Sequence, residues 1–364
     1  MIKKLILSLC CILLLSACKE ENKPQEQVAQ KPIIKIGAIL PLTGGSAVLG
    51  ASLKAGVLSA IEDKSKENLK YRYEAVFEDN QHTPAKSATA ANKLIASDKT
   101  DMLLTFATGP GHVVAPIAEN ARLLHMCATL EDENAKPMGK TTFWQGPTLR
   151  SYQRLMIKAL EKQNVKKLAL LAANVGVACS GTEHLADILA KKGMEVKVEC
   201  FNPTDRDFRM TIQKYISDGF EDFYLQAFPP QTDILVRQLK EQHILPERIF
   251  GAGIDTGTDT SVFENINHVG GNSGTPEFVD RLMSEYKLQN VYMAASAYDL
   301  ITLAIDAFEN AQDIKNVDEV IAYIKAHATR KCMSGDCKLL PNGFIANEAE
   351  WRTYQNGKPV PLEE

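Results

Sequence analysis

The sequence lacks the short motifs that identify common hydrolases and nucleotide-binding enzymes. It has no Gly-x-Ser-x-Gly elbow, no His-Glu-x-x-His zinc motif and no complete phosphate loop of the form Gly-x-x-x-x-Gly-Lys-Ser/Thr. The acidic pairs Glu78-Asp79 and Glu131-Asp132 are adjacent in the chain, and neighbouring side chains of an extended segment point apart, so neither pair makes an acid–base couple. We therefore expect no catalytic residues, no metal site and no cofactor.

The sequence also lacks a basic patch and, beyond its N-terminus, a long apolar run. Its formal net charge is −4, which disfavours nucleic acid and anionic lipid surfaces as partners. No later stretch is long and apolar enough to span a bilayer. The seven histidines are scattered; His125 lies in an apolar strand and is expected in the core, whereas His112 follows Gly111 at a helix start and could face a cleft.

The N-terminus carries the features of an export signal. Lys3 and Lys4 precede an apolar run over 5–15, which is too short for a spanning helix. The segment Leu15-Ser16-Ala17-Cys18 resembles a bacterial lipobox, so residues 1–17 are predicted to be a lipoprotein signal peptide and Cys18 the acylated first residue. The alternative is an ordinary signal peptide with an incidental cysteine. Residues 18–32 are polar after the cysteine and are predicted to be a flexible tether.

Of the eight cysteines, Cys10 and Cys11 lie in the predicted signal peptide and Cys18 is the predicted acylated residue, so five remain for disulfide bonds. Cys332 and Cys337 flank the turn-prone segment Met-Ser-Gly-Asp, which predicts a local disulfide in an exported protein. Cys179 and Cys200 could also pair, which would leave Cys127 free. A zinc site is the rival interpretation, disfavoured by the spacing and by the absence of paired histidines.

From residue 33 onwards, apolar strands alternate with amphipathic helices. The first strand, 33–40, runs into the Gly-rich turn Thr43-Gly44-Gly45-Ser46, and a helix follows with apolar residues at Leu49, Leu53, Val57 and Ile61. The alternation continues to residue 128, restarts near residue 151 and ends with helices over 293–309 and 317–328 and a strand–turn–strand tail at 351–358. This pattern predicts an α/β fold with two lobes, each a mostly parallel sheet flanked by helices.

The carboxyl ends of the predicted strands carry small and polar residues. In the first half these are Ser46 with its neighbours, the segment Thr105 to Gly109, and the segment Ala128 to Glu131. Ligands of open α/β sheets bind at these strand ends, and free N–H groups at helix starts favour a carboxylate. In the second half, Phe228 and Asp255 follow strands; Phe228 could contact the body of a ligand, and Asp255 is either an acceptor for an ammonium group or a turn residue.

The order and spacing of several segments resemble the type I periplasmic binding proteins, and most closely the branched-chain amino-acid (Leu/Ile/Val) receptors of ABC transporters. These segments are Ile36–Gly50, Glu78-Asp79, Thr108–Glu119, Cys127-Ala128-Thr129, Tyr298-Asp299 and Asn356-Gly357-Lys358. The resemblance implies a Venus-flytrap fold in which two lobes close on a ligand. It assigns residues 33–147 plus 274–330 to lobe 1 and residues 148–273 plus 331–364 to lobe 2.

The resemblance also implies ligand-binding residues. Thr108 would hold the ligand carboxylate, with Ala128 and Thr129 as its partners beside it. Gly109 and Ser46, at the strand ends, are further predicted ligand-binding residues. Leu49 and Phe228 would contact the side chain, and Asp255 would hold the α-ammonium. The loop 174–181 lacks the family's aromatic residue, and Cys179 stands near its position; the segment 268–275 is also shorter than usual.

We therefore expect a monomeric, lipid-anchored solute-binding protein outside the cytoplasm, periplasm-facing in a Gram-negative cell. Its partners would be a small zwitterion such as an amino acid, an ABC permease, and the membrane through its lipid anchor. The alternative is a sensor or envelope-protein regulator of the same fold that binds a protein partner and feeds no transporter.

Overall fold

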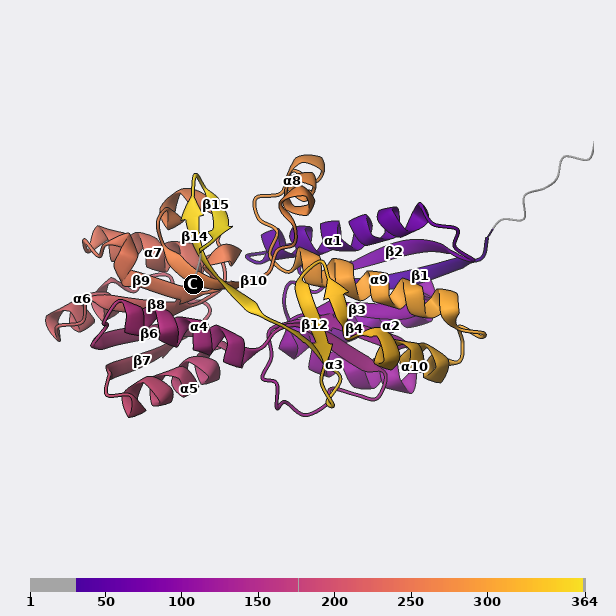
Figure 1. Ribbon diagram of the computed structural model, residues 1–364, viewed down its shortest axis with the longest axis horizontal. Helices are drawn as coiled ribbons and strands as arrows, with labels where there is room; N and C mark the ends of the chain where they lie inside the picture. The colour runs from indigo at the N-terminus through magenta and orange to yellow at the C-terminus, as the bar shows by residue number, and fades with distance from the viewer. Residues whose placement is uncertain (1–30, 176, 363–364) are drawn as a thin grey trace, which may run out of the picture. The chain divides into compact units, whose positions relative to one another are not determined.

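The computed structural model describes residues 31–175 and 177–362. The predicted signal peptide, Cys18 and nearly all of the predicted tether lie outside these residues. Within the described residues the chain builds two sheets of mostly parallel strands, each flanked by helices (Figure 1). The predicted α/β, two-lobed fold class is confirmed.

Lobe 1 is built on an eight-stranded sheet of order β11-β12-β13-β5-β4-β3-β1-β2. Its central strands are parallel and apolar on both faces, as expected of a sheet covered by helices on two sides. The strands are β1 (Ile33–Leu40), β2 (Arg72–Asp79), β3 (Met102–Phe106), β4 (Leu124–Ala128), β5 (Thr142–Pro147), β11 (Arg330–Cys332), β12 (Gly335–Leu339) and β13 (Phe344–Asn347).

Helices cover both faces of this sheet. Alternate residues of β1 separate the faces: Ile36 packs with the helices α1, α9 and α10, whereas Ile39 packs with α2 and α3. Figure 1 shows α1 and α9 side by side along the sheet. The helices are α1 (Ala47–Ser65), α2 (Pro84–Lys93) continued by the π-helix η1 (Leu94–Asp98), α3 (Thr108–Asn120), α8 (Pro276–Glu285), α9 (Ala294–Asn310) and α10 (Val317–His327).

Lobe 2 is built on a seven-stranded sheet of order β15-β14-β10-β9-β8-β6-β7. The strands are β6 (Lys167–Ala173), β7 (Glu195–Phe201), β8 (Asp222–Gln226), β9 (Ile249–Ala252), β10 (Asn267–Gly271), β14 (Ala349–Gln355) and β15 (Lys358–Pro361). Alternate residues of β6 again separate the faces, because Leu168 packs with α4 and α5 and Leu171 packs with α6 and α7. The helices are α4 (Leu149–Lys162), α5 (Ala178–Lys191), α6 (Arg209–Ser217) and α7 (Gln231–Glu241), with short 3-10 turns η2 (Pro246–Arg248), η3 (Ile254–Thr256) and η4 (Thr260–Phe263).

The chain passes between the lobes at three places: after β5, after β10 and after β13. The predicted assignment of everything after residue 330 to lobe 2 is wrong. The strands β11 to β13 extend the sheet of lobe 1, because β13 pairs parallel with β5 and places Phe344 opposite the buried Trp144. The chain enters lobe 2 for the last time only at β14.

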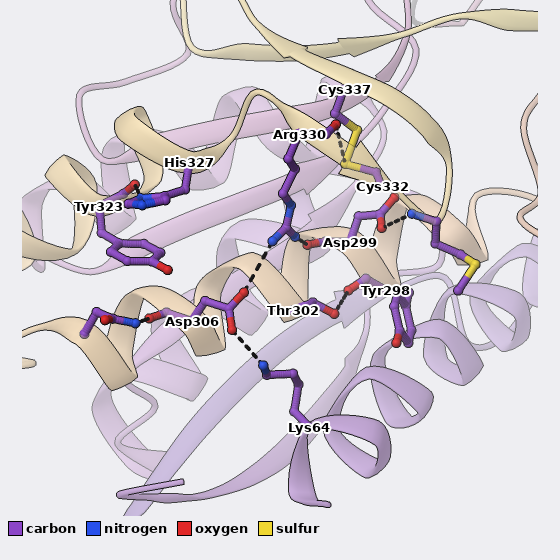
Figure 2. Close-up of polar contacts among 12 residues, drawn as sticks. Lys64, Tyr298, Asp299, Thr302, Asp306, Tyr323, His327, Arg330, Cys332 and Cys337 are labelled. Atoms are coloured by element: carbon purple, nitrogen blue, oxygen red, sulfur yellow. Dashed lines mark hydrogen bonds and ion pairs between the residues drawn. A yellow bond between two sulfur atoms is a disulfide. The ribbon is translucent and has the colours of Figure 1, made fainter. Parts of the chain in front are cut away.

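A buried carboxylate holds the β11–β12 hairpin against α9 (Figure 2). Asp299 accepts hydrogen bonds from the backbone N–H groups of Met333 and Ser334 at 2.7 and 2.9 Å, and from the Ser334 hydroxyl at 2.6 Å. Beside it, Asp306 of α9 forms ion pairs with Arg330 at 3.3 Å and with Lys64 at 2.8 Å. These contacts attach the β11–β12 hairpin to the core of lobe 1.

Candidate functional site

A cavity of about 150 Å³ lies between the carboxyl ends of strands from the two sheets. Lobe 1 contributes the end of β3, the segments that follow β2, β3 and β4, and Tyr292 just before α9. Lobe 2 contributes the segment that leads into α5 and the end of β8 with the residues that follow it. Pockets for drug-sized ligands measure roughly 300–1,000 Å³. The volume therefore fits a solute of a few heavy atoms with a compact apolar body.

The β3–α3 junction forms one wall of this cavity. Ala107 has φ +72° and ψ 150°, a conformation that residues with a Cβ rarely adopt, and its N–H donates to the Ala128 carbonyl at 2.9 Å. Such backbone strain is found preferentially at ligand sites. The bend starts α3 directly at the cavity, so the first N–H groups of this helix, at Thr108 and Gly109, have no intrahelical partner and favour an anion.

Two hydroxyl groups stand beside these N–H groups. Thr108 Oγ1 and Thr129 Oγ1 lie 3.0 Å apart, and both also contact the Leu130 carbonyl, at 3.3 and 3.0 Å. The Leu130 carbonyl has two lone pairs and can accept from both hydroxyls, and each hydroxyl can turn its proton to a ligand oxygen instead. Glu131 lies behind Thr108 without lining the cavity; burial raises its pKa, and hydrogen bonds from the Asp132 N–H and the Thr108 hydroxyl oppose that shift.

The remaining walls are largely aromatic. The His82 ring lies 5.5 Å from that of Phe106 and 5.7 Å from that of Phe228, and Tyr292 meets Phe106 edge to face at 6.3 Å. Burial lowers the pKa of His82, so its imidazole is neutral at pH 7, and Nδ1 lies 2.9 Å from Ser46 Oγ. Phe228 comes from lobe 2, so these rings join the two lobes around the cavity.

Four of the residues predicted to bind ligand line the cavity: Thr108, Gly109, Thr129 and Phe228. Ser46 is one contact away, through His82. Ala128 ends β4 with its carbonyl bonded to Ala107, and it lies behind the cavity wall.

Three further predicted residues do not reach the cavity. Leu49 is fully buried, because the first turn of α1 packs it into the core of lobe 1. Cys179 is joined to Cys200 by a disulfide that attaches α5 to β7, so its Sγ is not available to a ligand; its neighbour Ala178 lines the cavity in its place. Asp255 is 3% exposed and lies against the β10–β14 pair of lobe 2.

The contacts of Asp255 explain why it does not reach the cavity. Its Oδ2 is 4.0 Å from the Arg352 guanidinium, and its Oδ1 is buried without a hydrogen-bond partner among the described residues. Burial raises the pKa of Asp255 to about 6, and the Arg352 charge opposes that shift.

Sequence reasoning missed His82, Gln226 and Tyr292, which all line the cavity. His82 follows β2, and applying the strand-end rule to that strand would have identified it. Gln226 is the last residue of β8 and a polar residue in an apolar strand, which was a usable signal. Nothing in the sequence around Tyr292 distinguishes it from the core residues that follow.

A larger, more open hollow of about 550 Å³ lies where the chain crosses between the lobes. Its two arginines already face acidic side chains: Arg150 pairs with Glu133 at 2.6 Å and Arg154 with Glu348 at 2.7 Å. Because these cations are neutralised within the wall, the smaller cavity between the strand ends is the stronger candidate site.

The sequence is similar to bacterial proteins named as Leu/Ile/Val-binding protein homologues. It is 24% identical over 357 residues to the Leu/Ile/Val-binding protein homolog 2 of Brucella abortus (strain 2308), covering 89% of this chain and 92% of that one. It is 25% identical over 226 residues to the Leu/Ile/Val-binding protein homolog 3 of Brucella melitensis biotype 1, covering 61% of each chain.

Solved structures share the fold. The substrate-binding protein LivJ of Streptococcus pneumoniae, in complex with isoleucine, superimposes with a TM-score of 0.75 at 22% identity, over 90% of this chain and 97% of that one. A solute-binding protein of an ABC transporter from R. palustris, in complex with 4-hydroxybenzoate, gives a TM-score of 0.78 at 18% identity, over 91% and 96%. The family model described as "Periplasmic binding protein" matches residues 33–347. The chain therefore belongs to the periplasmic binding protein family, and within it to the type I proteins related to the branched-chain amino-acid receptors.

Proposed function

We propose that this protein is a lipid-anchored, extracytoplasmic solute-binding protein that delivers a small organic carboxylate to an ABC importer. The observation that carries the proposal is the cavity between the strand ends, where the start of α3 and two threonine hydroxyls face an aromatic wall to which both lobes contribute. Because ligand contacts both lobes only when they are closed, binding favours the closed arrangement. A permease would then distinguish the loaded from the empty protein.

The lobe 1 wall supports a carboxylate as the recognised group. Free N–H groups at Thr108 and Gly109 and the hydroxyl groups of Thr108 and Thr129 lie at one corner of the cavity. Isoleucine and 4-hydroxybenzoate, the ligands of the two solved relatives, both carry a carboxylate. An amino acid is the ligand that the family resemblance suggests.

A thermal-shift screen of amino acids, hydroxy acids and aromatic acids tests this function, because bound ligand raises the unfolding temperature by mass action. For a carboxylate hit, Thr108→Val should weaken binding about 10- to 150-fold, the range for a hydrogen bond of 1.5–3 kcal/mol to a charged group. Isothermal titration calorimetry measures the affinity. Thr89→Val, on the exposed face of α2, is the matched control and should bind as the wild type does.

A panel without a single hit would contradict the transport function and favour the alternative, a regulator of the same fold that binds a protein partner. Equal affinity of the Thr108→Val variant and the wild type would show that the ligand carboxylate does not bind at this corner of the cavity.

The lipid anchor rests on Leu15-Ser16-Ala17-Cys18, which lies outside the described residues. Among the described helices, none combines the length and apolar character needed to cross a membrane. Cys18→Ser should abolish labelling by a radioactive fatty acid and move the protein from the membrane fraction to the soluble fraction. Unchanged labelling would show that this cysteine is not the acylated residue.

A further inference from the structure

The wall that lobe 2 contributes to the cavity is apolar except for one amide. Its described residues are Val175, Val177, Ala178, Gln226 and Phe228. Gln226 ends β8 at the carboxyl edge of the sheet, 7% exposed. Within the described part of lobe 2, its amide is the only side chain that offers a conventional hydrogen bond to a ligand in this cavity.

Two hydroxyl groups determine which end of this amide faces the ligand. The side chains of Thr182 and Tyr224 both donate to Gln226 Oε1, each at 2.9 Å. Both residues are buried, and burial raises the pKa of Tyr224, which keeps its hydroxyl protonated. With the amide reversed, two N–H groups would face these oxygens and at least one buried hydroxyl proton would lack an acceptor, which is unfavourable.

The nitrogen of Gln226 therefore faces the cavity. Its Nε2 makes no hydrogen bond within the described part of the chain, and it is not among the fully buried atoms without a partner. Gln226 lines this cavity and also a separate space of about 10 Å³ that Tyr224 borders. Because Tyr224 holds Oε1, Nε2 is directed away from that space and toward the cavity. Lobe 2 thus presents N–H donors to whatever lies between the lobes.

No acidic side chain among the described residues lines the cavity to receive an ammonium group. Asp255 faces Arg352 at 4.0 Å, and Glu131 lies behind Thr108, where burial raises its pKa. A ligand ammonium would meet the N–H groups of Gln226, which repel it, whereas a ligand oxygen would accept from them.

We propose that the Gln226 amide, held by Thr182 and Tyr224, determines ligand class: the protein selects carboxylates that carry a neutral oxygen acceptor, a hydroxyl or carbonyl, where an amino acid carries its ammonium group. This inference rests on the proposed binding of a carboxylate at Thr108 and Thr129. The carboxylate meets lobe 1, the oxygen acceptor meets Gln226, and the apolar body contacts the aromatic wall.

Matched ligands test the selection directly with the full chain. Calorimetry compares valine with 2-hydroxy-3-methylbutanoate and 2-oxo-3-methylbutanoate, phenylalanine with 3-phenyllactate and phenylpyruvate, and benzoate with 4-hydroxybenzoate. In at least one series the oxygen-bearing acid should bind about tenfold more tightly than its amino or unsubstituted counterpart, the scale of one neutral hydrogen bond. Tighter binding of the amino acids would overturn the selection while leaving the proposed function intact.

Variants of Gln226 test the residue itself. Gln226→Met keeps the length of the side chain and should remove the tenfold preference. Gln226→Glu keeps one oxygen on Thr182 and Tyr224 and presents the other to the cavity, so it should reverse the preference in favour of the amino acid. Tyr224→Phe frees the amide to rotate and should reduce the preference without abolishing carboxylate binding.

Gln153→Met is the matched control. Gln153 is also a buried glutamine of lobe 2, but its Nε2 donates to the Gly181 carbonyl at 3.1 Å and it does not line the cavity. The Gln153→Met variant should show the same ligand preference as the wild type.

An unchanged preference in Gln226→Met would overturn the role of Gln226. The comparison of ligands on the wild-type protein decides the ligand class even if a variant fails to fold. Absence of binding by every carboxylate in the wild type would instead overturn the proposed function.

Discussion

Asp255 combines almost complete burial with an incomplete set of partners. One carboxylate oxygen lies 4.0 Å from the Arg352 guanidinium and the other has no hydrogen-bond donor among the described residues. Arg352 is shared with Glu350 at 3.2 Å and Ser273 at 2.9 Å, so its charge is only partly available to Asp255. Burial therefore dominates and raises the pKa of Asp255 to about 6.

This shift predicts a stability that falls as pH rises. The unfolded chain has the ordinary value of 3.8, so between about pH 4 and pH 6 the folded protein holds a proton that the unfolded chain has lost. Relative to Asp255→Asn, the wild type should lose about 2 kcal/mol of unfolding free energy between pH 4.5 and pH 7. Urea unfolding at the two pH values measures the difference.

Asp63→Asn is the control for this measurement. A hydrogen bond from Arg281 is the largest influence that lowers the pKa of Asp63, to about 2, so its contribution is present above pH 3.8 and is lost only as pH falls through the folded value. The gap between Asp63→Asn and the wild type should therefore be nearly equal at pH 4.5 and 7. A gap for Asp255→Asn that is also constant would show that Asp255 ionises normally.

At the residue scale, the sequence identified which residues follow strands better than it identified which way their side chains point. Thr108 and Thr129 follow strands directly, and the strand-end rule places them at the cavity. Asp255 also follows a strand, but its role depends on Arg352, which comes from a strand almost a hundred residues later in the chain. The sequence pattern around one residue does not contain such a pairing.

The individual elements of lobe 2 are joined by a covalent bond beside the cavity. The Cys179–Cys200 disulfide links the first turn of α5 to the end of β7 with a sequence separation of 21, whereas Cys332–Cys337 joins β11 to β12 with a sequence separation of only 5. The sequence predicted the second pair and left the first open, because pairing over 21 residues depends on how α5 packs against its sheet. Both disulfides are present in the structure.

Loop length predicts that the first disulfide contributes more to stability. Restricting a loop of this size in the unfolded chain is worth about 3 kcal/mol, and a loop of six residues about 2 kcal/mol. The double variant Cys179→Ser, Cys200→Ser should lose about 3 kcal/mol of unfolding free energy, measured by urea unfolding under oxidising conditions. Equal midpoints for this variant and the wild type would show that the bond does not form in the exported protein.

At the scale of the whole molecule, alternation of strands and helices predicted two lobes, and the apolar runs of the parallel strands made that prediction secure. The error concerned residues 331–347, which join the sheet of lobe 1. The turn-prone segment between Cys332 and Cys337 does not indicate to which lobe these residues belong. That choice is made by contacts that the sequence pattern does not encode: β13 against β5, and Asp299 against the hairpin turn.

The lobes approach each other so closely beside the cavity that a larger side chain at Gly45 can test this contact. Gly45, in the turn between β1 and α1, faces the β8–α7 segment of lobe 2, and a Cβ at this position would lie 3.2 Å from the Pro229 carbonyl oxygen and 3.3 Å from Pro230 Cδ. The residue is exposed, and its φ is not in the positive region, so a larger side chain costs its own lobe little. Bulk at Gly45 therefore acts on the contact between the lobes.

Gly45→Leu should weaken ligand binding without destabilising the empty protein. Overpacking costs about 1–3 kcal/mol, so if closure across this rim accompanies binding, the apparent affinity should fall about 5- to 150-fold. Ala51→Leu adds a similar side chain to an exposed position of α1 and should bind normally. Calorimetry measures affinity, and urea unfolding without ligand shows whether the lobes are intact. Unchanged affinity in Gly45→Leu would mean that ligand binds without bringing this turn against Pro229.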